Sequence, residues 1–176
     1  VEPSDVGVYF IYARIAEFSL FFASVSFFIW SGNISNLHQK NKNSEVQILL
    51  FKSYKLCFLF SLVFFIVTNI LAEEILFFIN PLYIEDIMVF RTLLIGFFIL
   101  GSAGILNSMF YIVGDTKFIT KLQIFLGTIF FLLIIVFVPK FGIQGCAVSF
   151  ALLQVIYILS MSIRLKSKFG YRIASF

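Results

Sequence analysis

Two residues of opposite charge, Arg14 and Glu17, lie three positions apart within an otherwise apolar stretch, residues 6–30. A helix with about 1.5 Å of rise per residue places Arg14 about 12 Å and Glu17 about 16 Å inside the outer boundary of a bilayer. A charge at such depth costs at least about 2.5–3.5 kcal/mol. The two side chains share one helix face, which Ser24 continues. The pattern predicts either a polar stripe lining a water-filled cavity, where Arg14 could meet an anionic head group, or a pair that neutralises itself for insertion.

Other polar residues also fall inside apolar stretches. Arg91 lies near the outer end of residues 88–113, where it could extend its guanidinium to the interface or contact a head group. Four amide side chains could form hydrogen bonds between helices or contact a substrate: Asn107, Gln123, Gln144 and Gln154. These residues are the best candidates for function, because placing a polar side chain in the hydrocarbon core of a membrane costs free energy.

Groups that could support catalysis or metal binding are sparse. His38 is the single histidine and is predicted to be solvated, and the sequence has no zinc-protease motif and no phosphate-binding glycine loop. Cys57 and Cys146 have no metal-ligand spacing and are predicted to be reduced. We therefore expect neither an enzyme nor a bound cofactor.

The elements that must position these residues are membrane helices. The chain has 176 residues, of which 61% are hydrophobic and 12% charged, with a mean hydropathy of +1.04. A soluble domain of this size could not bury that much apolar surface. Five stretches have the roughly 20 residues that a span requires: residues 6–30, 54–72, 88–113, 118–138 and 143–163. The sequence predicts an all-α integral membrane protein with five transmembrane helices.

The basic residues of the loops fall almost entirely on one side. One set of alternate loops carries ten: Lys40, Lys42, Lys52, Lys55, Lys117, Lys121, Arg164, Lys166, Lys168 and Arg172. The other set carries Lys140 and six acidic residues: Glu2, Asp5, Glu73, Glu74, Glu85 and Asp86. Short cytoplasmic loops hold the excess of Lys and Arg, so the N-terminus is predicted outside and the C-terminus in the cytoplasm. The net charge of +4 follows from this bias, and no nucleic-acid partner is expected.

The connections between the stretches have distinct signals. Residues 31–53 are predicted as a cytoplasmic loop, polar over 31–44 and followed by an interfacial helix over 45–55 that runs into the second span. Turn residues predict tight turns at 80–81, at 114–117 on the inner side and at 139–142 on the outer side. The third span is rich in small residues, which favours a position inside a helix bundle.

Two stretches carry a resemblance. Residues 106–121 read LNSMFYIVGDTKFITK, and residues 138–149 read VPKFGIQGCAVS. They resemble the C-terminal half of the Wzx-type polysaccharide-biosynthesis (O-antigen) flippases, which belong to the multidrug/oligosaccharidyl-lipid/polysaccharide exporter superfamily. Asp5–Tyr9 and Ala13–Ala16 are similar to the stretch entering that family's eighth helix. Cys146 stands where the family usually has alanine.

The resemblance implies a transporter of 12 or more helices in two six-helix lobes, with these spans as helices eight to twelve. Residues 1–176 would then be a C-terminal lobe fragment, partnered by an N-terminal lobe of the same protein and by membrane lipids. The implied activity is translocation of undecaprenyl-pyrophosphate-linked oligosaccharide, an O-antigen or capsule repeat unit, across the bacterial inner membrane by alternating access. Arg14, and second Arg91, would bind the head group. Glu17 would serve as counter-ion or as the coupling site for Na⁺ or H⁺.

Two alternatives stay open. A cation-coupled small-molecule exporter of the same superfamily would share the fold, because fold does not fix function. An inactive truncated remnant is the other, since the chain opens with Val1 in a loop-like sequence.

Overall fold

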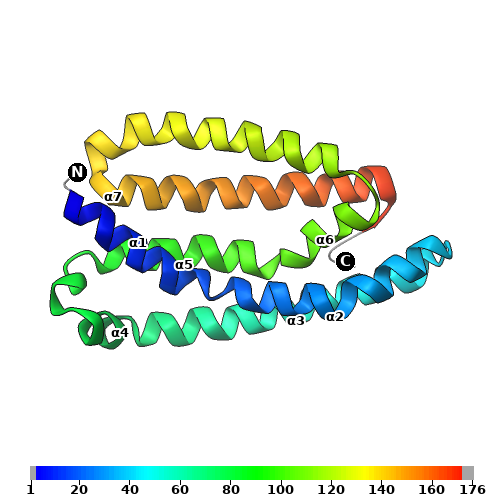
Figure 1. Cartoon of the computed structure of the whole chain (residues 1–176), viewed down its shortest axis with the longest axis horizontal. Coiled ribbons are helices and arrows are strands. Elements are labelled where there is room, and N and C mark those ends of the chain that lie inside the picture. Colours follow the sequence, from blue (N-terminus) through cyan, green and yellow to red (C-terminus); the bar gives the residue numbers. More distant parts are fainter. Residues whose placement is uncertain (1–2, 172–176) are drawn as a thin grey trace.

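The computed structural model describes residues 3–171, and every regular element in this range is helical. Glu2 and Arg172, which belong to the predicted charge pattern, lie outside the described residues. The elements are α1 (Pro3–Glu17), α2 (Leu20–Gln39), α3 (Asn43–Ile70), α4 (Ala72–Ile79), the 3₁₀ helix η1 (Pro81–Ile84), α5 (Ile87–Ser102), α6 (Gly104–Ile112) and α7 (Thr116–Phe169). The long helices lie roughly side by side in an elongated bundle (Figure 1).

Four helical stretches of the described chain are long and apolar enough to cross a membrane: Ser4–Gln39, Asn43–Ile70, Ile87–Ile112 and Thr116–Phe169. The last of these is α7, which is not straight. Gly142 has non-helical torsions of φ 58° and ψ −145°, and the helix reverses into two antiparallel limbs (Figure 1). A positive φ favours glycine, and Pro139 just before it interrupts the helical hydrogen bonds. The predicted turn at 139–142 is thus confirmed, with the reversal concentrated at Gly142.

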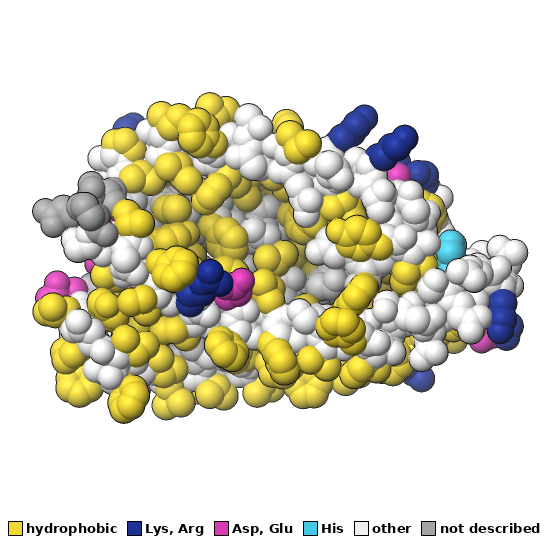
Figure 2. All heavy atoms as spheres, viewed as in Figure 1, with side chains coloured by type: hydrophobic (Ala, Val, Ile, Leu, Met, Phe, Trp, Pro, Cys, Tyr) yellow, Lys and Arg dark blue, Asp and Glu magenta, His cyan; other side chains and the backbone are white. Residues whose placement is uncertain are grey.

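The connections gather at the two ends of the bundle as the charge pattern predicts. The α2–α3 turn, the α6–α7 turn and the end of α7 lie at one end, which we call the inner end (Figure 1). The start of α1, α4 and the Gly142 bend lie at the other end. Dark-blue basic side chains are concentrated at the inner end (Figure 2). The predicted inner turn is present, with Gly114 at φ 73°.

The first apolar stretch contains a break. After α1, the amides of Phe18 and Ser19 bond three residues back, to Ile15 and Ala16, each over 3.2 Å. The Ser19 hydroxyl donates to the Phe97 carbonyl of α5 over 3.1 Å. This side-chain bond anchors the α1–α2 junction against α5.

The predicted cytoplasmic loop, residues 31–53, is largely helical. Helix α2 continues to Gln39 and α3 begins at Asn43, leaving only a short turn in which Asn41 has φ 56°. The polar residues over 31–39 predicted a segment outside the lipid. The segment is nevertheless helical, because Ile34 and Leu37 lie about one helical turn apart and pack against the core. The predicted helix over 45–55 is confirmed as the first part of α3, continuous with the second span.

Helices α5 and α6 form the interior of the bundle. In the most apolar part of Ile87–Ile112, 56% of residues are buried, against 22% for each of the two preceding stretches and 6% for α7. Small residues make this possible: a Cβ on Gly104 would lie 2.2 Å from the Ala23 Cβ, and one on Gly101 would lie 3.0 Å from the Ser19 carbonyl oxygen. The prediction that small residues place the third span inside the bundle is confirmed.

Candidate functional site

Arg14 and Glu17 form an ion pair at the end of α1. The Arg14 Nη1 donates to Glu17 Oε2 over 2.8 Å, which confirms that the two share a helix face. Their side chains are 62% and 45% exposed, and the guanidinium lies 4.8 Å from the centre of the Phe10 ring. Basic and acidic side chains meet amid apolar surface over the end of α1, beside a hollow between α1–α2 and α7 (Figure 2). The pair is therefore open to a ligand.

The predicted amide residues gather around one cavity. Asn107 of α6, Gln123 of the first α7 limb and Gln154 of the second limb line a cavity of about 470 Å³ together with Tyr157. The rest of the lining is apolar or glycine: Leu100, Leu126, Gly127, Phe130, Phe150 and Leu153. No charged side chain lines it. The cavity depends on the Gly142 reversal, because this brings the two limbs of α7 face to face (Figure 1).

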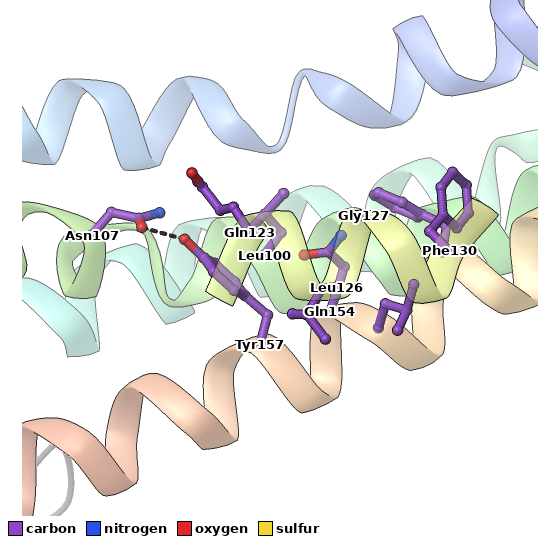
Figure 3. Close-up of a pocket in the computed structure, with 10 residues that line it drawn as sticks. Leu100, Asn107, Gln123, Leu126, Gly127, Phe130, Gln154 and Tyr157 are labelled. Atoms are coloured by element: carbon purple, nitrogen blue, oxygen red, sulfur yellow. Dashed lines mark hydrogen bonds between the residues drawn. The ribbon is translucent and has the colours of Figure 1, made fainter. Parts of the chain in front are cut away.

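Within the cavity, some polar groups are paired and one is not. The Tyr157 hydroxyl donates to Asn107 Oδ1 over 2.5 Å (Figure 3). The Gln154 carboxamide has no hydrogen-bond partner among the described residues, although its side chain is half-buried and directed into the cavity (Figure 3). A primary amide can donate two hydrogen bonds and accept two more. Helix pairing thus accounts for Asn107 but leaves Gln154 available.

A second cavity adjoins the first. It has a volume of about 450 Å³ and shares Leu100 and Asn107 with the first cavity. Its wall on α2 begins at Leu20 and includes Ser24. Arg14 and Glu17, the other two residues of the predicted polar stripe, line neither cavity; they lie on α1, six and three residues before Leu20. The exposed ion pair and the two cavities therefore follow one another along the same side of the molecule.

Arg91 has a different environment. Its Nη2 lies 3.9 Å from Glu73 Oε1, and its Nε is buried with no hydrogen-bond partner in the described part of the chain. Next to it in sequence, the Thr92 hydroxyl accepts from Gln144 Nε2 over 2.9 Å, which links α5 to α7. Neither Arg91 nor Gln144 lines a cavity. Both residues lie where they join helices near the outer end.

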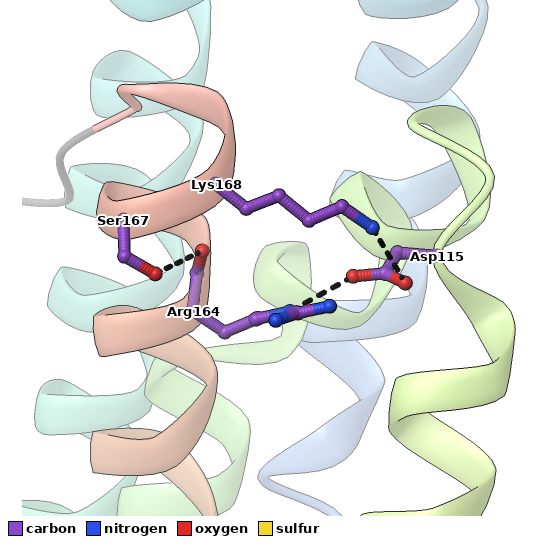
Figure 4. A network of polar contacts seen from close by, with 4 residues as sticks. All are labelled: Asp115, Arg164, Ser167 and Lys168. Carbon is purple, nitrogen blue, oxygen red and sulfur yellow. Dashed lines mark hydrogen bonds and ion pairs between the residues drawn. The ribbon is translucent and has the colours of Figure 1, made fainter.

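An ion-pair network at the inner end was not predicted from the sequence. Asp115, whose side chain is 10% exposed, lies 3.0 Å from both Arg164 Nε and Lys168 Nζ (Figure 4). Hydrogen bonds from Lys168 and then Arg164 hold the pKa of the Asp115 carboxyl below its usual range. Asp115 was predicted only as a turn residue. The available signal was the spacing of Arg164 and Lys168, which puts two cations on one face at a helix end.

His38, which was predicted to be solvated, is half-buried at the inner end and has a partner there. Its Nδ1 lies 3.1 Å from the Tyr171 hydroxyl, which donates to Asn43 Oδ1 over 2.9 Å. Tyr171 is 4% exposed. The residue after the end of α7 is thereby tied to the last turn of α2 and the first turn of α3.

Comparison with known proteins gives no family: no protein-family model matches the chain, and no curated protein sequence matches it.

Proposed function

We propose that this chain is part of a membrane transporter that moves an undecaprenyl-pyrophosphate-linked oligosaccharide from the inner to the outer leaflet of a bacterial inner membrane. The observation that carries the proposal is the exposed Arg14–Glu17 pair beside two adjoining cavities on an apolar face. The residue pattern of 106–121 and 138–149 supports the same class of substrate.

The chemistry of the head group fits an arginine at this position. A pyrophosphate cannot enter hydrocarbon unaided, so a cation at depth lowers the barrier to its passage. Arginine binds phosphate through two parallel N–H donors, which lysine cannot do. The salt bridge to Glu17 is local and exposed, and such pairs contribute little stability. A phosphate can therefore replace Glu17 as the partner of Arg14 at small cost, leaving Glu17 free to take a proton or Na⁺.

We further propose that the chain crosses the membrane five times. Each limb of α7, 116–141 and 143–169, exceeds the roughly 20 residues that a span requires. The inner end carries the excess of Lys and Arg, so it faces the cytoplasm. Little of the most apolar part of α7 is buried within the bundle. Its outer surface can therefore face lipid and a second helical lobe, as alternating access requires.

The test is export in a strain that lacks the gene. The full-length protein carrying Arg14→Ala should insert normally but fail to restore surface polysaccharide, because the head group loses its cationic partner. Arg14→Lys should restore only part of the export. Arg91→Ala is the matched comparison, since Arg91 is also an arginine near a glutamate, but its side chain is less exposed than that of Arg14 and its Nε is buried.

Full export by Arg14→Ala would remove Arg14 from the mechanism. Loss of export by Arg91→Ala alone would move head-group binding to Arg91. The cation-coupled small-molecule exporter would instead be favoured by two results together. The deletion strain carrying an empty vector would still make surface polysaccharide, and adding the gene would change the sensitivity of that strain to cationic dyes.

A further inference from the structure

We propose that the cavity lined by Asn107, Gln123, Gln154 and Tyr157, which we call the amide cavity, binds the uncharged, hydroxyl-rich part of the substrate, a sugar. This inference rests on the proposed function for the lipid carrier to which the sugar is attached. The sugar specificity itself rests on the composition of the cavity.

The polar groups of the cavity match hydroxyl groups rather than ions. The lining contains three carboxamides and one phenol but no charged side chain. Carboxamides and hydroxyls each donate and accept hydrogen bonds, as sugar hydroxyls do. An anion or a cation would leave its charge uncompensated in such a site, at high cost. The composition therefore selects a neutral polar ligand.

The free carboxamide of Gln154 is the strongest evidence for a ligand. It projects from the second limb of α7 into the cavity without a hydrogen-bond partner among the described residues (Figure 3). Within a membrane bundle, polar side chains usually bond across helices, as Tyr157 does with Asn107. Gln154 departs from that pattern, so its donors and acceptor remain available to an occupant.

The apolar part of the lining suits the carbon skeleton of a sugar. Phe130, Phe150 and Tyr157 contribute aromatic rings, whose faces are slightly negative and attract the C–H groups of a pyranose ring. The volume of about 470 Å³ lies within the range of about 300–1,000 Å³ typical of ligand pockets. A few polar groups within an apolar and aromatic wall are also the usual composition of such pockets.

The position of the amide cavity separates two parts of one substrate. The second cavity connects it, through Leu100 and Asn107, to the wall that begins at Leu20 on α2. Arg14 lies six residues before Leu20, on α1. The charged head group and the neutral sugar would thus contact different helices. A substitution in the amide cavity should affect the sugar alone.

The experiment measures equilibrium binding to the full-length protein in phosphatidylcholine nanodiscs. Three probes separate the contributions: undecaprenyl pyrophosphate, the same lipid linked to N-acetylglucosamine, and octyl glucoside, which has a sugar but no phosphate. The wild type should bind the sugar-bearing lipid about threefold to tenfold more tightly than the bare lipid, the effect of one or two hydrogen bonds.

Gln154→Leu should abolish this preference and weaken octyl glucoside binding while leaving the affinity for bare undecaprenyl pyrophosphate unchanged. Gln154→Asn, which keeps the amide, should retain part of the preference. Gln144→Leu is the matched control: it removes a glutamine of the same limb that bonds Thr92 outside the cavity, so the preference should persist. Unchanged binding of the bare lipid also shows that a variant is folded.

The outcomes distinguish the two proposals. Equal wild-type affinity for the two lipids, or a sugar preference that survives Gln154→Leu, overturns the amide cavity as a sugar site. Failure of Arg14→Ala to weaken either pyrophosphate lipid overturns the head-group proposal instead. Octyl glucoside binding that depends on Gln154 supports the sugar site even if neither pyrophosphate lipid binds.

Discussion

The inner end and the exposed side of this molecule use polar residues in opposite ways. At the inner end, Asp115 is paired with cations from the far end of α7, and the Tyr171 hydroxyl joins residues of α2 and α3. On the exposed side, Arg14 is paired only with a residue of its own helix, and Gln154 has no partner among the described residues. The first arrangement connects elements, whereas the second leaves polar groups accessible.

This difference indicates where stability and function lie. Long-range polar contacts lose their partners when the fold opens, so they contribute to its stability. A local, exposed pair keeps its partner whether or not the bundle is packed and contributes little. The inner end should therefore respond to substitution as a structural region, and the side with Arg14 and the amide cavity as a binding region.

The largest effect on stability should come from Asp115→Asn. The substitution removes the carboxylate charge shared by Arg164 and Lys168, so the melting temperature in detergent should fall at neutral pH. The pKa of the Asp115 carboxyl in the folded protein is depressed below its ordinary value of 3.8, chiefly by the hydrogen bond from Lys168. Its contribution is therefore complete above that value and is lost only as pH falls through the lower folded pKa.

Melting curves of the two proteins followed by circular dichroism test this. The gap in melting temperature between wild type and Asp115→Asn should stay constant from about pH 8 to about pH 5 and shrink only below about pH 4. A gap that closes already near pH 6 would exclude the Asp115 carboxylate as its source.

A smaller loss should follow Tyr171→Phe. The hydroxyl contacts both His38 and Asn43, and losing it should cost about 1 kcal/mol of unfolding free energy. Tyr111→Phe is the control, because the Tyr111 side chain is 60% exposed and has no hydrogen bond among the described residues. Equal stability of the two variants in chemical denaturation would contradict a structural role for the Tyr171 hydroxyl.

The smallest change in stability should come from replacing Arg14 and Glu17 together by alanine. An exposed pair at this spacing contributes less than about 0.5 kcal/mol, and removing both residues leaves no unpaired charge. The same double variant should lose binding of undecaprenyl pyrophosphate. A marked fall in melting temperature with intact binding would reverse the comparison between the two regions.

The local features of the fold were accessible from the sequence. Apolar stretches predicted the helices, and turn residues predicted the turns in which Gly114 and Gly142 have positive φ. The three-residue spacing predicted that Arg14 and Glu17 share one helix face. Each of these follows from interactions within a few residues. The break after Glu17 was not predicted, and beside it the Ser19 hydroxyl donates to the Phe97 carbonyl of another helix, a contact between residues far apart in the sequence.

The arrangement of the candidate site was only partly accessible. Polarity inside apolar stretches marked Asn107, Gln123 and Gln154, but the sequence could not show that they share one cavity. That result depends on the angle at which the α7 limbs meet. The extension of α2 to Gln39 was missed for a related reason: polarity reports affinity for lipid, whereas Ile34 reports packing against other helices.

The reversal of α7 at Gly142 also has a consequence for how the protein is made. Synthesis proceeds from the N-terminus, so α1 to α6 leave the ribosome first. The hairpin of α7 leaves last, carrying Gln123, Gln154 and Tyr157. Asn107, on α6, has no Tyr157 partner until this hairpin packs against α6. The amide cavity therefore cannot be complete until both limbs of α7 have been synthesised, and a chain that ends near Gly142 would lack the cavity wall that Gln154 and Tyr157 provide.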